Sequence, residues 1–317
     1  MTSDKDVEHY ATLFDIHFLL QGLCLHQSLT ERATPFHLWI LCVDEAVEHN
    51  LMKLNLPNVT LLPLREVETA RLKEVKGDRS IGEYCWTLTP FLPQFVFEKA
   101  PDVKRVTYLD ADLYLFDDPA PFFAEFEKAR KHVLITDHAY APEYDKSALV
   151  GRFCVQFLTF RNTQEAKRVI SWWQQRCLEW CYAREEDDKF GDQKYLDAWP
   201  QLFREEVHIL SQQDRTLAPW NVLHIERKSS GKLSPVFYHF HDLRIHPNRR
   251  VTLYSAYKIG RTGRTLYASY LQALRGAARR VDRLGMTFGT FLQRPGWLAW
   301  AGRLQRRFLG TEMKASL

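Results

Sequence analysis

The chain has 317 residues, of which 45% are hydrophobic and 26% charged, a balance that is typical of a folded globular protein and excludes a disordered chain. Its apolar runs end well short of the roughly 20 residues that cross a bilayer, and the charged N-terminus leads into no apolar signal segment. We therefore expect a cytoplasmic protein. The formal net charge of +4 is uneven, because acidic residues become rare after residue 250.

Short β-type apolar runs alternate with helical stretches through the first half of the chain. Strands are predicted over residues 9–14, 36–43, 59–64, 103–109 and 133–136. The helices predicted between them span residues 18–28, 44–54, 88–99 and 121–130. A strand over 153–160, helices over 163–182 and 192–198, and a last core strand over 236–240 follow. This order predicts a three-layer α/β/α domain with a mainly parallel mixed sheet.

A basic helical appendage, residues 251–317, is expected to follow a main domain of residues 1–250. Apolar residues in its first part keep helical spacing and leave the arginines elsewhere on the helix: Leu266, Tyr270, Leu274, Val281 and Leu284. A second stretch, 291–308, mixes aromatic with basic residues. Such amphipathic helices either lie on an anionic membrane surface, here at the inner face of the membrane, or pack on the main domain. Both alternatives stay open.

Two carboxylates follow the predicted strand 103–109 directly. Asp110 and Asp112 are separated only by the small residue Ala111. Ligands of open α/β sheets gather at the carboxyl ends of strands. Carboxylates at i and i+2 there can share one Mg²⁺ or Mn²⁺ and leave positions for diphosphate oxygens. For this pair alone, the alternative is that Asp110 caps a turn and Asp112 is solvated.

The run Y-L-D-A-D-L at 108–113 resembles the D-x-D motif of glycosyltransferases of the A-type (GT-A) fold, especially the family 8-like nucleotide-diphospho-sugar transferases. The run G-D-Q-K-Y-L at 191–196 is similar to the D-Q motif of this group, and F-Y-H-F-H at 237–241 to its late histidine motif. The motifs occur in the family's order across roughly residues 8–250.

The resemblance implies a metal-dependent transferase of GT-A fold that moves a sugar from a nucleotide diphosphate, UDP favoured, to a glycan or lipid-linked acceptor with retention of configuration. It implies Mn²⁺ or Mg²⁺ held by Asp110, Asp112 and His239. Asp192 and Gln193 are the implied catalytic residues, one holding sugar hydroxyls and the other near the anomeric carbon. The implied donor contacts are Thr12, Asp15, Tyr84, Trp86, Asp110, Ala111, Cys154, Gln156 and His241.

Some positions depart from the family pattern or have another interpretation. Cys154 stands where related sequences carry Asn or Asp for the donor sugar, and a thiol replaces an amide poorly. Gln156 would supply the missing amide if the register of this strand shifts. Asp242 is a second departure, because the histidine motif of the family usually continues with Gly. Asp15 is equally suited to cap the following helix. His241 is equally suited to be a hydrogen-bonded histidine of the core.

Other classes of function fit the sequence less well. A phosphatase of the haloacid dehalogenase class also uses D-x-D after a strand, but it leaves the D-Q and histidine motifs unexplained. The second reading is a non-catalytic module of the same fold that binds a nucleotide sugar or a membrane. No nucleic-acid partner is expected, because the sequence holds no nucleic-acid-binding motif. It also lacks a Walker A loop and G-x-G-x-x-G.

Overall fold

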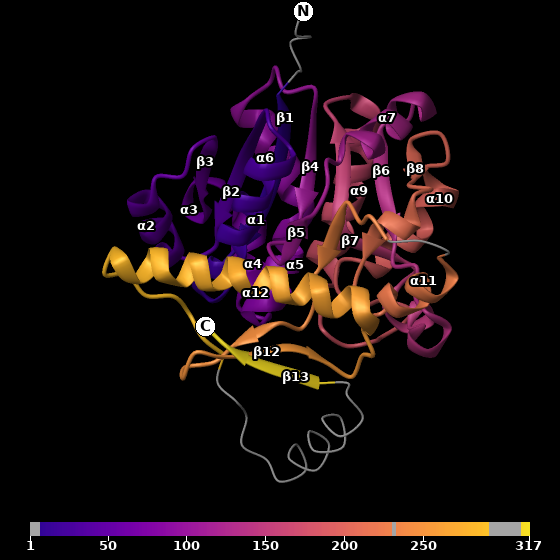
Figure 1. Cartoon of the computed structure of the whole chain (residues 1–317). Coiled ribbons are helices and arrows are strands. Elements are labelled where there is room, and N and C mark those ends of the chain that lie inside the picture. Colours follow the sequence, from indigo (N-terminus) through magenta and orange to yellow (C-terminus); the bar gives the residue numbers. More distant parts are fainter. Residues whose placement is uncertain (1–6, 230–232, 292–311) are drawn as a thin grey trace, which may run out of the picture.

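The structure, a computed structural model, describes residues 7–229, 233–291 and 312–317 (Figure 1). The main sheet of this part has seven strands in the order β3-β2-β1-β4-β7-β6-β8. Their bounds are β1 Glu8–Phe14, β2 Phe36–Cys42, β3 Val59–Pro63, β4 Arg105–Leu109, β6 Val133–Asp137, β7 Phe153–Arg161 and β8 Val207–Ile209. All neighbours are parallel except β7, which is antiparallel to both β4 and β6. The prediction of a mainly parallel mixed sheet is confirmed.

Helices cover both faces of this sheet, so the predicted three layers are present. Alternate side chains of β1 enter two cores: Tyr10 and Phe14 face one, Ala11 and Leu13 the other. On the first face lie α1 (Leu19–Arg32), α2 (Glu45–Leu54), α7 (Ala120–Ala129) and α12 (Gly260–Arg283). On the second lie α4 (Ala70–Lys76), α5 (Ile81–Leu88), α6 (Leu92–Lys99), α9 (Gln164–Glu179) and α10 (Trp199–Leu202).

Two smaller sheets lie outside the main one in the described chain. β10 (Phe237–His239) pairs antiparallel with β5 (Leu113–Leu115) and parallel with β9 (Thr216–Leu217). β12 (Arg250–Ser255) pairs with β11 (Arg244–Ile245) and β13 (Glu312–Ser316). The predicted strand 236–240 therefore exists, but it belongs to a small sheet. Its register sets His239 opposite Leu113, directly after the D-x-D motif.

Several helix starts are encoded by capping side chains. The Asp44 carboxylate accepts a hydrogen bond from the Val47 amide at the start of α2, at 2.7 Å. Ser80 and Glu83 form a capping box at α5, a helix that the sequence analysis did not predict. The predicted helix 88–99 is divided into η2 (Thr89–Phe91) and α6, each with a proline in its first turn. Proline is tolerated there because the first-turn amides lack helical partners.

Short elements complete the described chain. The one-turn and two-turn helices are α3 (Leu64–Val67), α8 (Ser147–Val150) and α11 (Val222–Lys228). The 3-10 helices are η1 (Ile16–Phe18), η3 (Pro142–Tyr144), η4 (Lys194–Ala198) and η5 (Gln213–Arg215). η1 and η4 matter most here, because they follow the end of β1 and the D-Q motif.

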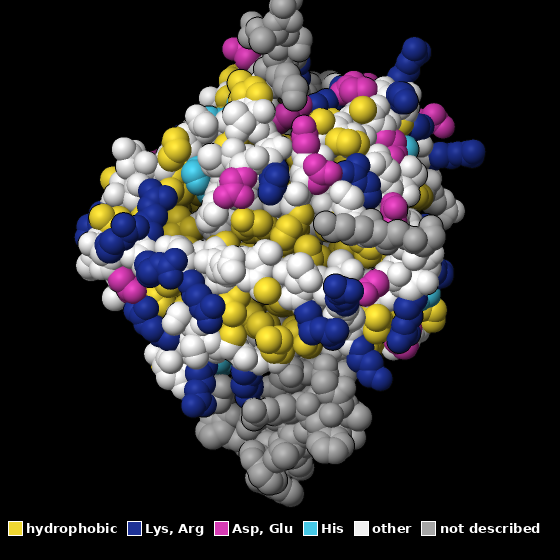
Figure 2. All heavy atoms as spheres, viewed as in Figure 1, with side chains coloured by type: hydrophobic (Ala, Val, Ile, Leu, Met, Phe, Trp, Pro, Cys, Tyr) yellow, Lys and Arg dark blue, Asp and Glu magenta, His cyan; other side chains and the backbone are white. Residues whose placement is uncertain are grey.

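The first predicted amphipathic helix of the appendage is α12, which crosses in front of the sheet (Figure 1). Its buried residues, among them Tyr267 and Tyr270, join the core of the first face and pack towards α1 and α11. Its apolar face is therefore used inside the protein, which is the second of the two alternatives. Arginines occupy the outward face, where Figure 2 shows basic side chains gathered over α12.

The second predicted amphipathic stretch, 291–308, lies outside the described residues except for Phe291. Among the helices of the described ranges, none combines the length and apolar character needed to cross a membrane.

Candidate functional site

The turn that carries the two carboxylates is held by backbone hydrogen bonds from three sides. β4 ends at Leu109, and the Asp110 amide donates to the Gln156 carbonyl of β7 at 3.1 Å. The Leu113 amide donates back to the Asp110 carbonyl at 3.1 Å. The Phe240 amide, just after β10, donates to the Asp112 carbonyl at 3.0 Å. The turn is thus fixed at the carboxyl end of β4, between β7 and β10.

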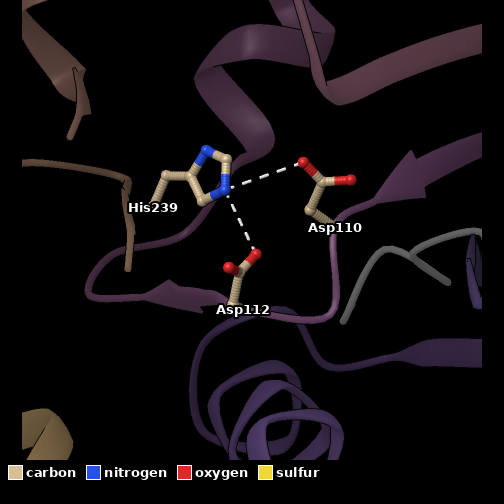
Figure 3. Close-up of side chains that lie close together, drawn as sticks. All are labelled: Asp110, Asp112 and His239. Carbon is tan, nitrogen blue, oxygen red and sulfur yellow. Dashed lines mark ion pairs between the residues drawn. The ribbon is translucent and has the colours of Figure 1, made fainter. Parts of the chain in front are cut away.

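His239 meets both carboxylates at this turn (Figure 3). Its Nε2 lies 3.1 Å from Asp112 Oδ1 and 3.7 Å from Asp110 Oδ2. One ligand atom from each of the three residues lies within 4.8 Å of the others. Two carboxylate oxygens and one imidazole nitrogen suit Mn²⁺ or Mg²⁺, with positions left for other oxygen ligands. The residues present therefore fit the divalent cation that the resemblance implies.

Burial and mutual charge perturb the three groups. Burial raises the pKa of Asp110 to about 6, while the positive charge of His239 opposes the rise. Burial also acts on Asp112, but the adjacent imidazole outweighs it and holds the pKa of Asp112 below its ordinary value. Against the effect of burial, the two carboxylates raise the pKa of His239 well above its usual range. A proton on His239 and a divalent cation therefore compete for the same place, so cation binding should release a proton.

Neighbouring side chains surround this cluster closely. Gln156 Oε1 lies 2.8 Å from His239 Nδ1, and the Tyr108 hydroxyl donates to Asp110 Oδ1 at 2.9 Å. The Trp220 ring meets the His239 ring edge-on, with centroids 5.4 Å apart. The Trp220 indole N–H donates to the His138 carbonyl at 2.7 Å, which fixes the ring against β10.

The D-Q motif lies between α9 and η4. Asp192 is buried, and burial raises the pKa of its carboxyl well above the ordinary value, with the charge of Asp110 adding to the rise. Asp192 and the D-x-D turn are therefore electrostatic neighbours. The Trp173 indole N–H donates to the Asp192 carbonyl at 2.8 Å. Half-buried Gln193 donates from Nε2 to the Val150 carbonyl at 2.7 Å.

The end of β1 holds Thr12 and Asp15. Thr12 is buried, and its hydroxyl has no hydrogen-bond partner among the described residues. Asp15 Oδ1 accepts from the His17 amide at 2.9 Å and Oδ2 lies 3.1 Å from His17 Nδ1, so the carboxylate caps η1. The capping alternative is thus present, at η1 and not at α1. The chain after α12 returns here, where the Gly289 amide donates to the Ile16 carbonyl at 2.9 Å.

Two predicted donor contacts lie on α5. Tyr84 is only 2% exposed, and its hydroxyl donates to Glu68 Oε1 at 2.6 Å. This arrangement anchors α5 and leaves the Tyr84 hydroxyl engaged. The ring of half-buried Trp86 packs beside the D-Q motif. The approach is so close that a Cβ at Gly191 would lie only 3.2 Å from this ring. Gly191 has φ +53°, which favours glycine at this close approach.

The remaining predicted contacts cluster around His239. Ala111 is buried between the two carboxylates, and Cys154 is buried at the start of β7. Burial raises the pKa of the Cys154 thiol, which is also in hydrogen-bonding contact with His239. His241 has 44% of its side chain exposed, and its ring lies 5.5 Å from Trp220. The structure therefore brings Ala111, Cys154 and His241 close to the Asp110–Asp112–His239 cluster.

Sequence reasoning missed Arg244 on β11. Its guanidinium lies over the rings of Phe291 and Phe18, 5.0 and 5.9 Å from their centroids. Its positive charge helps to lower the pKa of Asp112, so the side chain lies in the field of the cluster. The sequence did contain a signal, since a basic residue follows shortly after the histidine motif. The chain turns between this motif and β11, however, and spacing in the sequence does not show where the side chain lies after that turn.

The sheet order, the D-x-D turn after β4 and the late histidine define the class, and the chain has the fold of the GT-A glycosyltransferases. An active-site mutant of LgtC matches with a TM-score of 0.54 at 14% identity, over 93% of this chain and 99% of that chain. The apo form of GlyE from Streptococcus pneumoniae TIGR4 matches with a TM-score of 0.53 at 14% identity, over 90% of this chain and 66% of that chain. Mouse xyloside xylosyltransferase 1 matches with a TM-score of 0.51 at 15% identity, over 74% of this chain and 98% of that chain. At these identities the likeness shows the fold.

Two relatives from Bacillus subtilis (strain 168) are more similar in sequence. YfnD is 30% identical over 297 residues, which cover 89% of this chain and 93% of YfnD. YfnF is 32% identical over 249 residues, which cover 74% and 82%. The chain therefore belongs to the family of YfnD and YfnF, both described as uncharacterized proteins. No protein-family model matches the chain.

Proposed function

We propose that this protein is a metal-dependent glycosyltransferase that moves a sugar from a nucleotide diphosphate donor, UDP favoured, to a glycan or lipid-linked acceptor. The observation that carries the proposal is the Asp110–Asp112–His239 cluster at the carboxyl end of β4 in a GT-A fold. Solved structures of this fold support it, since one is a galactosyltransferase, LgtC, in complex with donor and acceptor sugar analogues.

The chemical difficulty is the departure of the nucleoside diphosphate from the anomeric carbon. Asp110 Oδ2, Asp112 Oδ1 and His239 Nε2 would hold a divalent cation, which neutralises charge on the leaving diphosphate. Arg244 would add a fixed positive charge beside the same oxygens. The bond from the anomeric carbon to the diphosphate oxygen breaks with its electron pair on that oxygen. The acceptor hydroxyl oxygen forms the new bond to the anomeric carbon, and its proton passes to the departing diphosphate oxygen.

Asp192 and Gln193 are the proposed catalytic residues on the sugar side. Asp192, buried next to the cluster, would bind sugar hydroxyls, and Gln193 would lie near the anomeric carbon. One LgtC structure is of an active-site mutant in which glutamine is replaced by glutamate, which supports a glutamine role in this fold. We propose retention of configuration, with departure and attack on one face of the sugar. NMR of the product decides this, and an inverted product would contradict it.

Several of the expected donor contacts remain proposals around these residues, whereas the polar ends of Tyr84 and Gln156 are engaged by Glu68 and His239. Thr12 and Asp15 at the end of β1 and Trp86 on α5 would face the nucleoside. Ala111 lies between the metal ligands, where its backbone would meet the ribose or diphosphate. His241, exposed beside Trp220, would contact the diphosphate.

We also propose a cytoplasmic location, with an anionic membrane surface as a peripheral partner for residues 251–317. What supports the membrane part is the outward arginines of α12, such as Arg264 and Arg279. The attraction would be electrostatic, since the apolar face of α12 is buried. Flotation with anionic vesicles should therefore be lost when charge is removed at both arginines, and flotation that does not change would contradict the proposal.

Calorimetry of UDP, GDP, CMP and dTDP with and without Mn²⁺ tests the main proposal. We expect one diphosphate to bind only with Mn²⁺, and binding to be lost in the Asp110→Asn/Asp112→Asn double variant. Asp102→Asn/Glu205→Gln removes the same charge from exposed positions and should bind as wild type. If no nucleotide binds the folded protein, the transferase proposal loses its main support. A nucleotide sugar that binds and is never transferred would favour the non-catalytic module.

A further inference from the structure

Gln156 is connected to two of the three residues of the metal cluster. Its backbone carbonyl accepts from the Asp110 amide at 3.1 Å, and its side-chain Oε1 lies 2.8 Å from His239 Nδ1. Gln156 lies on β7, which pairs with β4, whereas His239 lies on β10 in a different sheet. One residue therefore bridges the carboxylate turn and the strand that supplies the nitrogen ligand.

The side chain of Gln156 is held in this position. It is 1% exposed, and its amide is turned towards the imidazole. The neighbouring residues on β7, Val155 and Phe157, face two different cores. A long polar side chain in such packed surroundings keeps its hydrogen bond, because a buried donor or acceptor without a partner is costly.

The direction of this hydrogen bond determines which nitrogen of His239 can bind a cation. An amide oxygen only accepts, so Nδ1 must carry the proton and donate it to Gln156 Oε1. Nε2 is then the nitrogen left to face a cation, because it lies 3.1 Å from Asp112 Oδ1 and 3.7 Å from Asp110 Oδ2. Histidines that bind metals generally donate their other ring N–H to such an acceptor, which orients the ring and increases its basicity.

We propose that Gln156 is a positioning residue for the metal site: it fixes His239 in the Nδ1–H tautomer and aims Nε2 between the two carboxylates. This inference rests on the proposed metal site. It gives Gln156 a different role from the donor-sugar contact expected from the sequence, since its side chain is already engaged by His239.

The test is Mn²⁺ affinity without nucleotide, measured by electron paramagnetic resonance on the full chain. Gln156→Met keeps the length of the side chain and removes the acceptor, and we expect Mn²⁺ binding to weaken roughly 10- to 100-fold. Gln156→Glu keeps an acceptor oxygen and should bind Mn²⁺ at least as tightly as wild type. Val155→Ala, a packing change on the opposite face of the same strand, should bind Mn²⁺ as wild type even if it lowers the melting temperature.

A spectroscopic signal separates positioning from general packing. With Mn²⁺ at saturation, electron spin echo modulation should show the nitrogen coupling of His239 in wild type and Gln156→Glu, and an altered or absent coupling in Gln156→Met. Unchanged affinity and coupling in Gln156→Met, beside normal binding by wild type, would overturn the inference and leave the proposed function standing. A wild-type protein that binds no Mn²⁺ would overturn both.

Discussion

Replacing Tyr270 tests whether α12 is part of the structural support of the site. Tyr270 is fully buried, and its ring stacks on Phe240 with centroids 3.7 Å apart and planes at 10°. It also meets Tyr114 edge-on at 5.6 Å. Phe240 follows His239 directly, and Tyr114 lies on β5, just after the carboxylate turn. The Tyr270 ring thus packs against both segments that carry the proposed metal ligands.

The magnitude follows from this packing. Removing a buried aromatic ring leaves a cavity that neighbours fill only in part, so Tyr270→Ala should lower the free energy of unfolding by about 3–5 kcal/mol. The Tyr270 hydroxyl has no hydrogen-bond partner among the described residues. Tyr270→Phe keeps the ring and removes an unpartnered polar group, so it should change stability by less than about 1 kcal/mol.

Urea unfolding of wild type and both variants measures these differences, and Mn²⁺ titration of the folded proteins measures the effect on the site. We expect Tyr270→Ala to weaken Mn²⁺ binding and Tyr270→Phe to leave it unchanged, because only the first removes the support behind Phe240. If Tyr270→Ala costs less than about 1 kcal/mol, α12 is not part of the core, and the reasoning from its packing fails.

Three further predictions concern other parts of the molecule. In Gly289→Ala the new Cβ would lie 2.7 Å from the backbone N and Cα of His17, so η1 or the backbone around residue 289 must shift. We expect UDP affinity to fall in calorimetry. An unchanged affinity would show that Gly289 is not packed against η1 as described. Burial opposes ionisation of Glu125, but hydrogen bonds from Ser211 and others outweigh it and lower the pKa from 4.5 to about 2. Because the folded pKa is depressed, this stability is fully present above about pH 4.5 and is lost as the pH falls through about 2. Glu125→Gln should therefore lower the free energy of unfolding by about 2–3 kcal/mol at pH 7 and by roughly 1 kcal/mol at pH 3. An unfolding difference that does not vary with pH would refute this prediction. Arg244→Gln should weaken UDP binding roughly tenfold with little loss of stability, as expected for a single charge–diphosphate contact, and binding equal to wild type would exclude that contact.

Local patterns made much of the fold predictable. The buried strands at residues 8–14, 36–42 and 153–161 are mainly apolar runs, and the capping side chain Asp44 marks the start of a helix. Asp110 and Asp112 were identified because their motif is short and contiguous. His239 was added only through the resemblance, since nothing local connects it with residues far earlier in the chain.

The main errors concern features that depend on distant partners. The antiparallel direction of β7 was not predicted, because the pattern of apolar residues in a buried strand does not indicate its direction relative to its neighbours. The histidine strand was placed in the core without the small sheet that pairs it with β5. α5 was missed although its capping box is local, because no element was assigned to the stretch before the helix predicted over 88–99.

The sequence by itself determined most of the strands and helices of the main domain, the carboxylate pair and the amphipathic character of α12, because each is set by neighbours within a few residues. Only the tertiary structure decided that the apolar face of α12 is buried behind Phe240. It alone showed that Arg244 lies over the rings of Phe18 and Phe291 and that Gln156 turns to His239. These contacts join residues far apart in the chain, and their free energy comes from burial and hydrogen bonds that exist only after the sheets have assembled.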